Sequence, residues 1–136
     1  MREIKFKAYA KAYNKIVNVD RLGLNSDRTA QEIIVTEREL GEYDSDEWTD
    51  LQAGEFELLQ YTGLKDKNGV EIYEGDVVSF KSAHSDCDYK TIGEVVWYCG
   101  EAAFLVECDG EIFKHFDEIR EIEVLGNIYE NPELLQ

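Results

Sequence analysis

Short stretches in which apolar and polar residues alternate recur along the whole chain, and this period of two is typical of half-buried β-strands. The stretches lie roughly 8–12 residues apart and are separated by turn-forming residues, which favours a small barrel or sandwich over alternating strands and helices. The pattern predicts strands at residues 4–9, 16–19, 31–36, 56–61, 72–80, 92–98, 102–107, 112–113 and 122–126.

Turn and helix signals complete this outline. Asn14 marks the turn of an N-terminal hairpin, Asn68-Gly69 favours a tight turn with positive φ, and Gly75-Asp76 marks the turn through which the next strand is entered. Residues 37–50 are acidic and form either a surface loop or a short helix, and residues 116–120 form one helical turn. We therefore expect a mainly β protein, β-rich α+β at most, built from small antiparallel barrel-like units with an SH3-like C-terminal half.

The length of 136 residues corresponds to a single compact domain, and 43% hydrophobic residues are enough to form a core. We predict one domain over residues 1–136. The alternative is a subdivision into an N-terminal β subdomain, residues 1–45, and a C-terminal SH3-like β-barrel subdomain, residues 55–136, with the join between about residues 37 and 55.

Charge is distributed unevenly along the chain, which carries 30 acidic and 14 basic side chains and a formal net charge of -16. Residues 1–20 hold five basic and two acidic side chains, a local charge of +3, whereas residues 21–60 carry -8 and residues 61–136 carry -11. Nucleic acids and anionic membranes repel such a surface, so direct binding to either is not expected.

The sequence also indicates a compartment. Charged residues interrupt the N-terminal apolar positions, so no signal peptide is predicted, and no run approaches the ~18 apolar residues of a membrane span. The odd number of cysteines, Cys87, Cys99 and Cys108, is a poor framework for disulfides. We therefore expect a cytoplasmic protein with reduced cysteines.

Three segments resemble the YopX family of phage and prophage proteins. Residues 60–69 followed by 72–78 are similar to the central signature of that family, residues 126–134 to its C-terminal signature, and residues 4–9 to its N-terminal strand. In that strand the family usually has arginine and tryptophan, where this chain has Lys7 and Tyr9. The resemblance implies a mainly β fold, a phage or prophage origin and the cytoplasm of a bacterial host. It implies no assigned activity and brings no catalytic residues.

The two longer signatures supply the candidate interaction surface. A functional interpretation makes the central signature a loop that presents Tyr61, Lys65, Lys67 and Tyr73, with Asn127 and Tyr129 added from the C-terminal signature. A structural interpretation, which we favour, assigns the glycines and asparagines of both segments to backbone turns and the apolar residues to packing.

Metal and catalytic patterns are weak, so no metal site, cofactor or catalytic residue is predicted. The soft ligands lack the paired spacing of structural zinc sites. The paired carboxylates Asp44/Asp46 and Asp86/Asp88 do not continue into the glycine and distal glutamate of a calcium-binding loop, and Asp66-x-Asn68-Gly69 has the glycine but lacks a run of ligands. The possible zinc ligands are His84, Cys87, Cys99, Cys108 and His115.

Three functions are compatible with these observations. The leading expectation is a non-enzymatic protein-interaction or self-assembling module, a homo-oligomer that binds a host or phage protein through its strands, turns and aromatic side chains. The first alternative is an acidic DNA mimic, and the second is a small-molecule enzyme with a site between subdomains that involves His115 and Glu118. The carboxylates of the mimic would be Glu37, Glu39, Glu42, Asp44, Asp46, Glu47, Asp50, Glu55 and Glu57.

Overall fold

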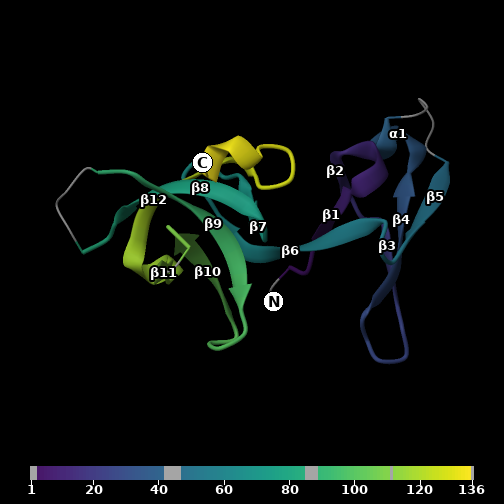
Figure 1. Cartoon of the computed structure of the whole chain (residues 1–136), viewed down its shortest axis with the longest axis horizontal. Coiled ribbons are helices and arrows are strands. Elements are labelled where there is room, and N and C mark those ends of the chain that lie inside the picture. Colours follow the sequence, from purple (N-terminus) through teal and green to yellow (C-terminus); the bar gives the residue numbers. More distant parts are fainter. Residues whose placement is uncertain (1–2, 42–46, 85–88, 111, 136) are drawn as a thin grey trace. The chain divides into compact units, whose positions relative to one another are not determined.

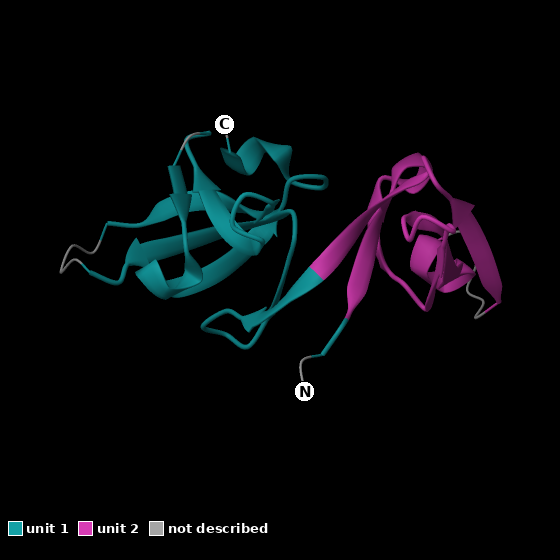
Figure 2. Ribbon diagram, turned by 90° about the horizontal axis from the view of Figure 1, so that it is seen from below, with its two compact units in different colours: residues 1–4, 61–136 teal, residues 5–60 magenta. Residues whose placement is uncertain are grey.

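The computed structural model describes residues 3–41, 47–84, 89–110 and 112–135, and it is mainly β, with antiparallel strands and a few short helical turns (Figure 1). The chain divides into two compact units, unit 2 at Lys5–Gln60 and unit 1 at Met1–Ile4 with Tyr61–Gln136 (Figure 2). The transition falls inside one strand, β6 (Phe56–Lys65), whereas the sequence interpretation set the join between about residues 37 and 55.

Unit 2 contains two groups of antiparallel strands. In the first, β1 (Phe6–Ala10) pairs with β2 (Lys15–Asn18) on one side and with the first half of β6 on the other. In the second, β4 (Ala30–Thr36) lies between β3 (Arg21–Leu24) and β5 (Trp48–Gln52). The core between these strands is formed by Ala8, Ala10, Val17, Ile33, Val35, Leu40, Leu51 and Phe56.

Short helical segments connect the strands of unit 2. The 3-10 turn η1 (Lys11–Tyr13) ends at Asn14, whose φ of 50° is the left-handed conformation that asparagine tolerates, and the chain then returns as β2. Helix α1 (Glu37–Leu40) begins at Thr36, whose hydroxyl accepts the Glu39 N–H, and ends at Gly41 with φ 77°. The expected N-terminal hairpin and a short helix within residues 37–50 are therefore present.

Unit 1 is built on a five-stranded antiparallel sheet in the order β11-β10-β9-β8-β12. The strands are β8 (Asp76–Ser82), β9 (Thr91–Tyr98), β10 (Ala103–Cys108), β11 (Ile112–Lys114) and β12 (Ile119–Asn127). Strands β8 to β11 form a meander, a 3-10 turn η2 (Phe116–Glu118) follows, and β12 returns beside β8. This strand order is that of an SH3-like barrel, as expected for the C-terminal half.

The core of unit 1 lies on one face of this sheet, because alternate residues of each strand point to the same side. The buried side chains of this face include Val78 and Phe80 of β8, Val95 of β9 and Val106 of β10. Ile72, from the short strand β7 (Glu71–Tyr73), packs on the same cluster. On the opposite, outer face, Leu105 of β10 is also buried, whereas Ile92 of β9 is 43% exposed.

The structure differs from the sequence prediction of strands at residues 72–80, 21–24 and 48–52. Residues 72–80 form two strands, β7 and β8, because Gly75 has φ 87° and turns the chain between them. Strands β3 and β5 were not predicted from their own residues, although both pair with β4.

No helix in the described ranges has the length and apolar content needed to cross a bilayer.

Candidate functional site

The two signature segments lie side by side in unit 1. Strand β12 pairs with β8 so that Asn127 is opposite Asp76 and Gly126 is opposite Val77. The Gly75 carbonyl accepts a hydrogen bond from the Ile128 N–H at 2.9 Å. The central and C-terminal signatures therefore form one structural feature at the β8–β12 edge of the sheet.

Asp66, at the centre of the first signature, is a structural residue. Its side chain is buried, and its Oδ1 accepts the backbone N–H groups of Asn68 at 2.8 Å and Val70 at 2.9 Å. Its Oδ2 accepts the Val124 N–H at 2.9 Å, which ties the turn to β12. Burial raises the pKa of this carboxyl, but the hydrogen bonds from Val124, Val70 and Asn68 outweigh burial, so the pKa of Asp66 lies below its ordinary value.

The predicted loop residues of the central signature separate into two kinds. The rings of Tyr61 and Tyr73 contact each other with centroids 5.4 Å apart, and both side chains are buried. Lys65 and Lys67 are exposed, and Lys67 Nζ lies 3.3 Å from Glu123 Oε2. The two tyrosines therefore contribute packing, and only the two lysines are presented to solvent.

Asn127 holds the backbone of the C-terminal signature in a turn. Its side-chain oxygen accepts the N–H groups of Tyr129 at 3.0 Å and Glu130 at 2.8 Å, and its own N–H donates to Asn131 Oδ1. A Cβ at Gly126 would lie 3.0 Å from Leu134 Cδ1, so glycine allows the C-terminal turn to approach β12 closely. The structural interpretation therefore accounts for Asn127, while Tyr129 is partly exposed beside it.

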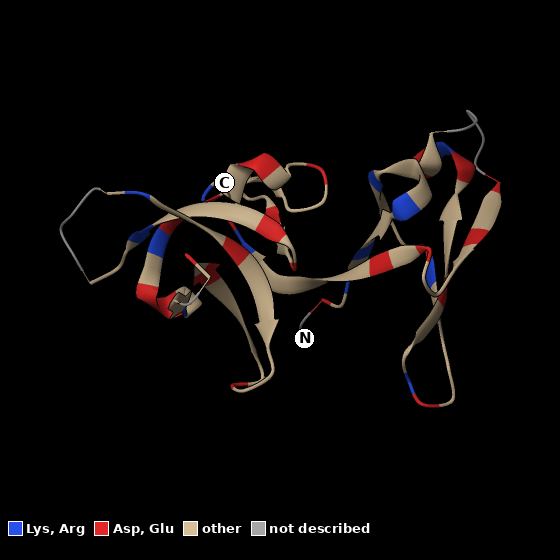
Figure 3. Ribbon diagram, in the orientation of Figure 1, with Lys and Arg blue, Asp and Glu red and all other residues tan. Residues whose placement is uncertain are grey.

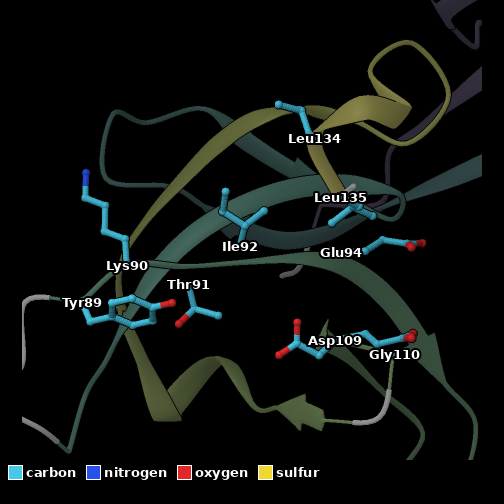
Figure 4. Close-up of a pocket in the computed structure, with 10 residues that line it drawn as sticks. Tyr89, Lys90, Thr91, Ile92, Glu94, Asp109, Gly110, Leu134 and Leu135 are labelled. Carbon is cyan, nitrogen blue, oxygen red and sulfur yellow. The ribbon is translucent and has the colours of Figure 1, made fainter.

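The best candidate site is a groove that is lined by none of the six side chains predicted from the two signatures. It is a cavity of about 630 Å³ on the outer face of β9, between the β10–β11 turn and the C-terminal 3-10 turn η3 (Pro132–Leu135) (Figure 4). We call it the acidic groove. It is lined by Tyr89, Lys90, Thr91, Ile92, Glu94, Glu107, Asp109, Gly110, Leu134 and Leu135.

Local sequence explains why these side chains face the groove. Strand alternation buries Val95 in the core and turns Glu94 outward. Gly93, on the inner face, permits close packing of β9 on β10, since a Cβ there would lie 2.6 Å from Val106 Cγ1. At the other side, Asp109 and Gly110 reverse the chain with φ 53° and 76°, which places Asp109 at the rim of the groove.

Apolar side chains form part of the groove, although they are accessible to solvent. Ile92 is 43% exposed and Leu135 is 45% exposed. Figure 4 shows Tyr89 and Lys90 at one end of the β9 segment and Glu94 at the other, with Leu134 and Leu135 contributed by η3. An occupant that covers these side chains removes apolar area from water, which favours binding.

The polar lining is acidic. Glu94 on β9 is directly opposite Glu107 on β10, so two like charges are neighbours across this pair of strands. Burial, followed by the charges of Glu107 and Glu74, raises the pKa of Glu94 above its ordinary value. With Asp109 the groove holds three carboxylates against one basic side chain, Lys90. Figure 3 shows acidic positions in strands and turns of both units.

His115 and Glu118 bind each other at the start of η2. Glu118 Oε2 accepts the His115 N–H at 3.0 Å, which closes a capping box at the start of η2, and His115 Nε2 lies 2.9 Å from Glu101 Oε2. Of the other side chains considered for zinc, His84 is exposed. Cys108 is buried in the core, Cys99 is exposed, and Cys87 lies outside the described residues.

Other carboxylate hypotheses are only partly covered by the described residues. Within these residues no cluster of three or more histidine, cysteine, aspartate or glutamate side chains is placed to hold a metal ion. Described carboxylates of the DNA-mimic segment bind neighbours within unit 2: Glu39 binds Asn18, Glu57 binds Lys11, and Asp50 and Glu55 both accept from Gln52. Outside the described residues lie Glu42, Asp44, Asp46, Asp86 and Asp88.

Sequence reasoning did not identify the acidic groove. The alternation in residues 92–98 predicted a strand, but it did not show that the outward side chains of β9 face η3. The only signal was the C-terminal signature, which includes Leu134 but was interpreted through its asparagines.

The comparisons with known proteins place this structure among similar ones. The family model described as YopX protein matches residues 5–136. The crystal structure of protein EF1440 from Enterococcus faecalis is 26% identical, with a TM-score of 0.65 and coverage of 100% of both chains. The crystal structure of protein yopX from Bacillus subtilis is 19% identical, with a TM-score of 0.60 and coverage of 100% of this chain and 98% of that one, and it supports the fold. Among proteins of curated function, none matches the chain.

Proposed function

The chain belongs to the YopX family, and from this premise we propose that it is a non-enzymatic protein-interaction module whose binding site is the acidic groove. The partner is a host or phage protein, or a second copy of this chain. The proposal places the protein in the cytoplasm of a bacterial host that carries the phage or prophage.

The observation that carries this proposal is the combination of a cavity of about 630 Å³ with apolar side chains that are close to half exposed. Ligand-binding cavities commonly have volumes of about 300–1,000 Å³, and the acidic groove falls in this range, with a lining that is more polar than is usual for such cavities. In the acidic groove the apolar groups come from β9 and η3, and the carboxylates come from β9, β10 and the turn after β10. Such a site offers both buried area and charge for recognition.

The scaffold suits a binding role. Asp66 fastens the turn after β6 to β12, and Gly126 allows η3, which supplies Leu134 and Leu135 to the groove, to pack closely against β12. A site built on strands loses little conformational freedom when a partner binds. The signature residues therefore support the groove even where they do not contact its occupant.

Site-specific photo-crosslinking in bacterial cells tests this function. A benzophenone amino acid replaces Ile92 in the groove and, as a matched control, Leu24 of unit 2, which is 48% exposed against 43% for Ile92. We expect a discrete cross-linked product at position 92, identified by mass spectrometry, and no such product at position 24. Sedimentation velocity separates a second copy from a foreign partner.

A second variant shows whether the cross-linked product depends on the groove itself and not on misfolding caused by the bulky probe. Leu135→Asp in the chain labelled at position 92 introduces another charge into the groove, and we expect it to remove the product while circular dichroism stays unchanged. Identical cross-linking at positions 92 and 24, or no product together with a strict monomer, would contradict the proposed function.

A further inference from the structure

We propose that the acidic groove binds a peptide segment of a protein partner in which a lysine or arginine lies next to a large apolar side chain. This inference rests on the proposed function and specifies its ligand. The basic group lies over Glu94 and Glu107, and the apolar group packs between Ile92 and Leu135.

The negative charge of the groove favours the basic group of this ligand. Glu94, Glu107 and Asp109 face the cavity, and among the described residues Lys90 is the one basic side chain in its lining. Three negative charges and one positive charge leave a formal charge of -2. Like charges directly across an antiparallel pair are unfavourable, and a cation placed over Glu94 and Glu107 replaces that repulsion by attraction.

The partial burial of Glu94 strengthens this selection. Carboxylates that are removed from water and surrounded by others of the same sign gain more from a cationic partner than fully hydrated ones do. Glu107 of β10 lies directly opposite Glu94, and the charge of Glu74, in the turn between β7 and β8, also disfavours the ionised form of Glu94. Both carry the same charge as Glu94, so an anionic ligand is excluded by the same geometry.

The apolar side chains of the groove favour the large apolar group of this ligand. Ile92 and Leu135 are 43% and 45% exposed, and Tyr89 at the end of the groove is 73% exposed. A free polyamine has no large apolar group to cover them, whereas a peptide with leucine, isoleucine or phenylalanine beside the cation covers them and binds both kinds of group at once. The ligand class is therefore a basic and apolar peptide rather than a small amine.

The test uses four probes on the full chain: the peptide acetyl-Leu-Lys-Leu-Lys-Leu-Gly-amide, the same peptide with glutamate for lysine, the same peptide with serine for leucine, and spermidine. Binding is followed by two-dimensional NMR of backbone amides. We expect the first peptide to shift the amides of Glu94, Glu107, Asp109 and Leu135, and to bind at least tenfold more tightly than the other three. Its affinity falls as salt rises from low ionic strength, since attraction between exposed charges is screened.

Charge-matched variants identify the groove as the site. Glu94→Gln with Glu107→Gln removes two charges from the groove, and Glu55→Gln with Glu57→Gln removes two from unit 2. We expect at least tenfold weaker binding of the first peptide to the groove variant and a change of less than twofold for the unit 2 variant. The spectra of both free variants report whether each is folded.

Three results would overturn the inference: shifts confined to other residues, equal affinity for the glutamate peptide, or equal affinity for spermidine. Equal loss in the two charge-matched variants would also overturn it, because the attraction would then come from net charge alone. If cross-linking at position 92 captures a partner through an acidic or uncharged segment, the ligand class is wrong and the proposed function stands. If position 92 captures nothing and the chain is a strict monomer, the proposed function itself fails.

Discussion

Replacing Asp66 by asparagine tests whether the central signature is structural. In the native chain the two carboxylate oxygens accept three backbone N–H groups, two from the turn itself and one from Val124 of β12. Asparagine keeps an oxygen that can accept from Asn68 and Val70, but its NH2 group then faces the Val124 N–H. The substitution therefore removes the hydrogen bond to β12 and brings two donors, the new NH2 group and the Val124 N–H, face to face.

The expected loss follows from the strength of such bonds. A hydrogen bond to a charged group contributes about 1.5–3 kcal/mol, so Asp66→Asn is expected to cost about that amount. Asp66→Ala leaves all three donors without the carboxylate and is expected to cost about 3–5 kcal/mol. A loss of about 2 kcal/mol lowers the thermal midpoint by roughly 8–16 °C in a domain of 60–100 residues.

The pH dependence has a definite sign. The folded pKa of Asp66 is lowered, so its contribution is present above the unfolded pKa of about 3.9 and is lost as pH falls through the folded pKa. The difference between native protein and Asp66→Asn is therefore expected to be largest at neutral pH and to shrink in acid.

Urea unfolding measured by tryptophan fluorescence checks these values unit by unit. The chain has two tryptophans, Trp97 in unit 1 and Trp48 in unit 2, so a Trp48→Phe background reports unit 1 alone. Asp27→Asn is the control, because Asp27 accepts the Thr29 N–H and hydroxyl in an exposed turn of unit 2. An unchanged Trp97 transition in Asp66→Asn, or a loss that is as large at pH 3 as at pH 7, would refute the reasoning.

Four further predictions concern stability and association. Gly75→Val forces a β-branched residue into φ 87° and is expected to cost about 1–3 kcal/mol, so an unchanged melting temperature would contradict it. Gly93→Ala places a Cβ 2.6 Å from Val106 Cγ1 and 2.7 Å from a backbone oxygen, and urea unfolding is expected to show a loss of about 1–3 kcal/mol; native stability in this variant would mean that β9 and β10 move apart freely. Glu94→Gln removes the repulsion with Glu107 and is expected to stabilise by about 0.2–1 kcal/mol at pH 7. Because the folded pKa of Glu94 is raised, its ionised form is the less stable one, so this gain disappears below about pH 4, the range of the unfolded pKa, and a gain that persists in acid denaturation series would be inconsistent with it. Self-association is expected to increase as pH approaches the pI of about 4.4, where repulsion vanishes, and light scattering that stays flat down to that pH would disprove it.

Much of the strand pattern could be predicted because alternation is a local property of the chain. The expected strands at 31–36 and 92–98 correspond closely to β4 and β9, and η2 lies where one helical turn was expected. Strand β5 was missed because its own residues are mostly polar, and its extended conformation is set by pairing with β4. A strand whose partner supplies most of the stabilisation carries little signal in its own sequence.

The candidate site was less accessible to sequence reasoning. Tyr61 and Tyr73 belong to a family signature, and aromatic rings on strands suit either packing or binding, but only the tertiary structure shows that both rings are buried. The acidic groove combines residues from β9, the β10–β11 turn and η3, which are separated by up to about forty positions in the sequence.

The sequence by itself determined the mainly β class, the positions of the tight turns at Asn14, Asn68-Gly69 and Gly75, and the acidic character of the chain, because each depends on residue type and short-range backbone preference. Only the tertiary structure decided that the chain passes between its two units inside β6, and that Glu94 and Glu107 lie opposite each other beneath Leu135 of η3. The physical reason is that strand register and the packing of distant segments arise from many contacts at once, and no local pattern contains them.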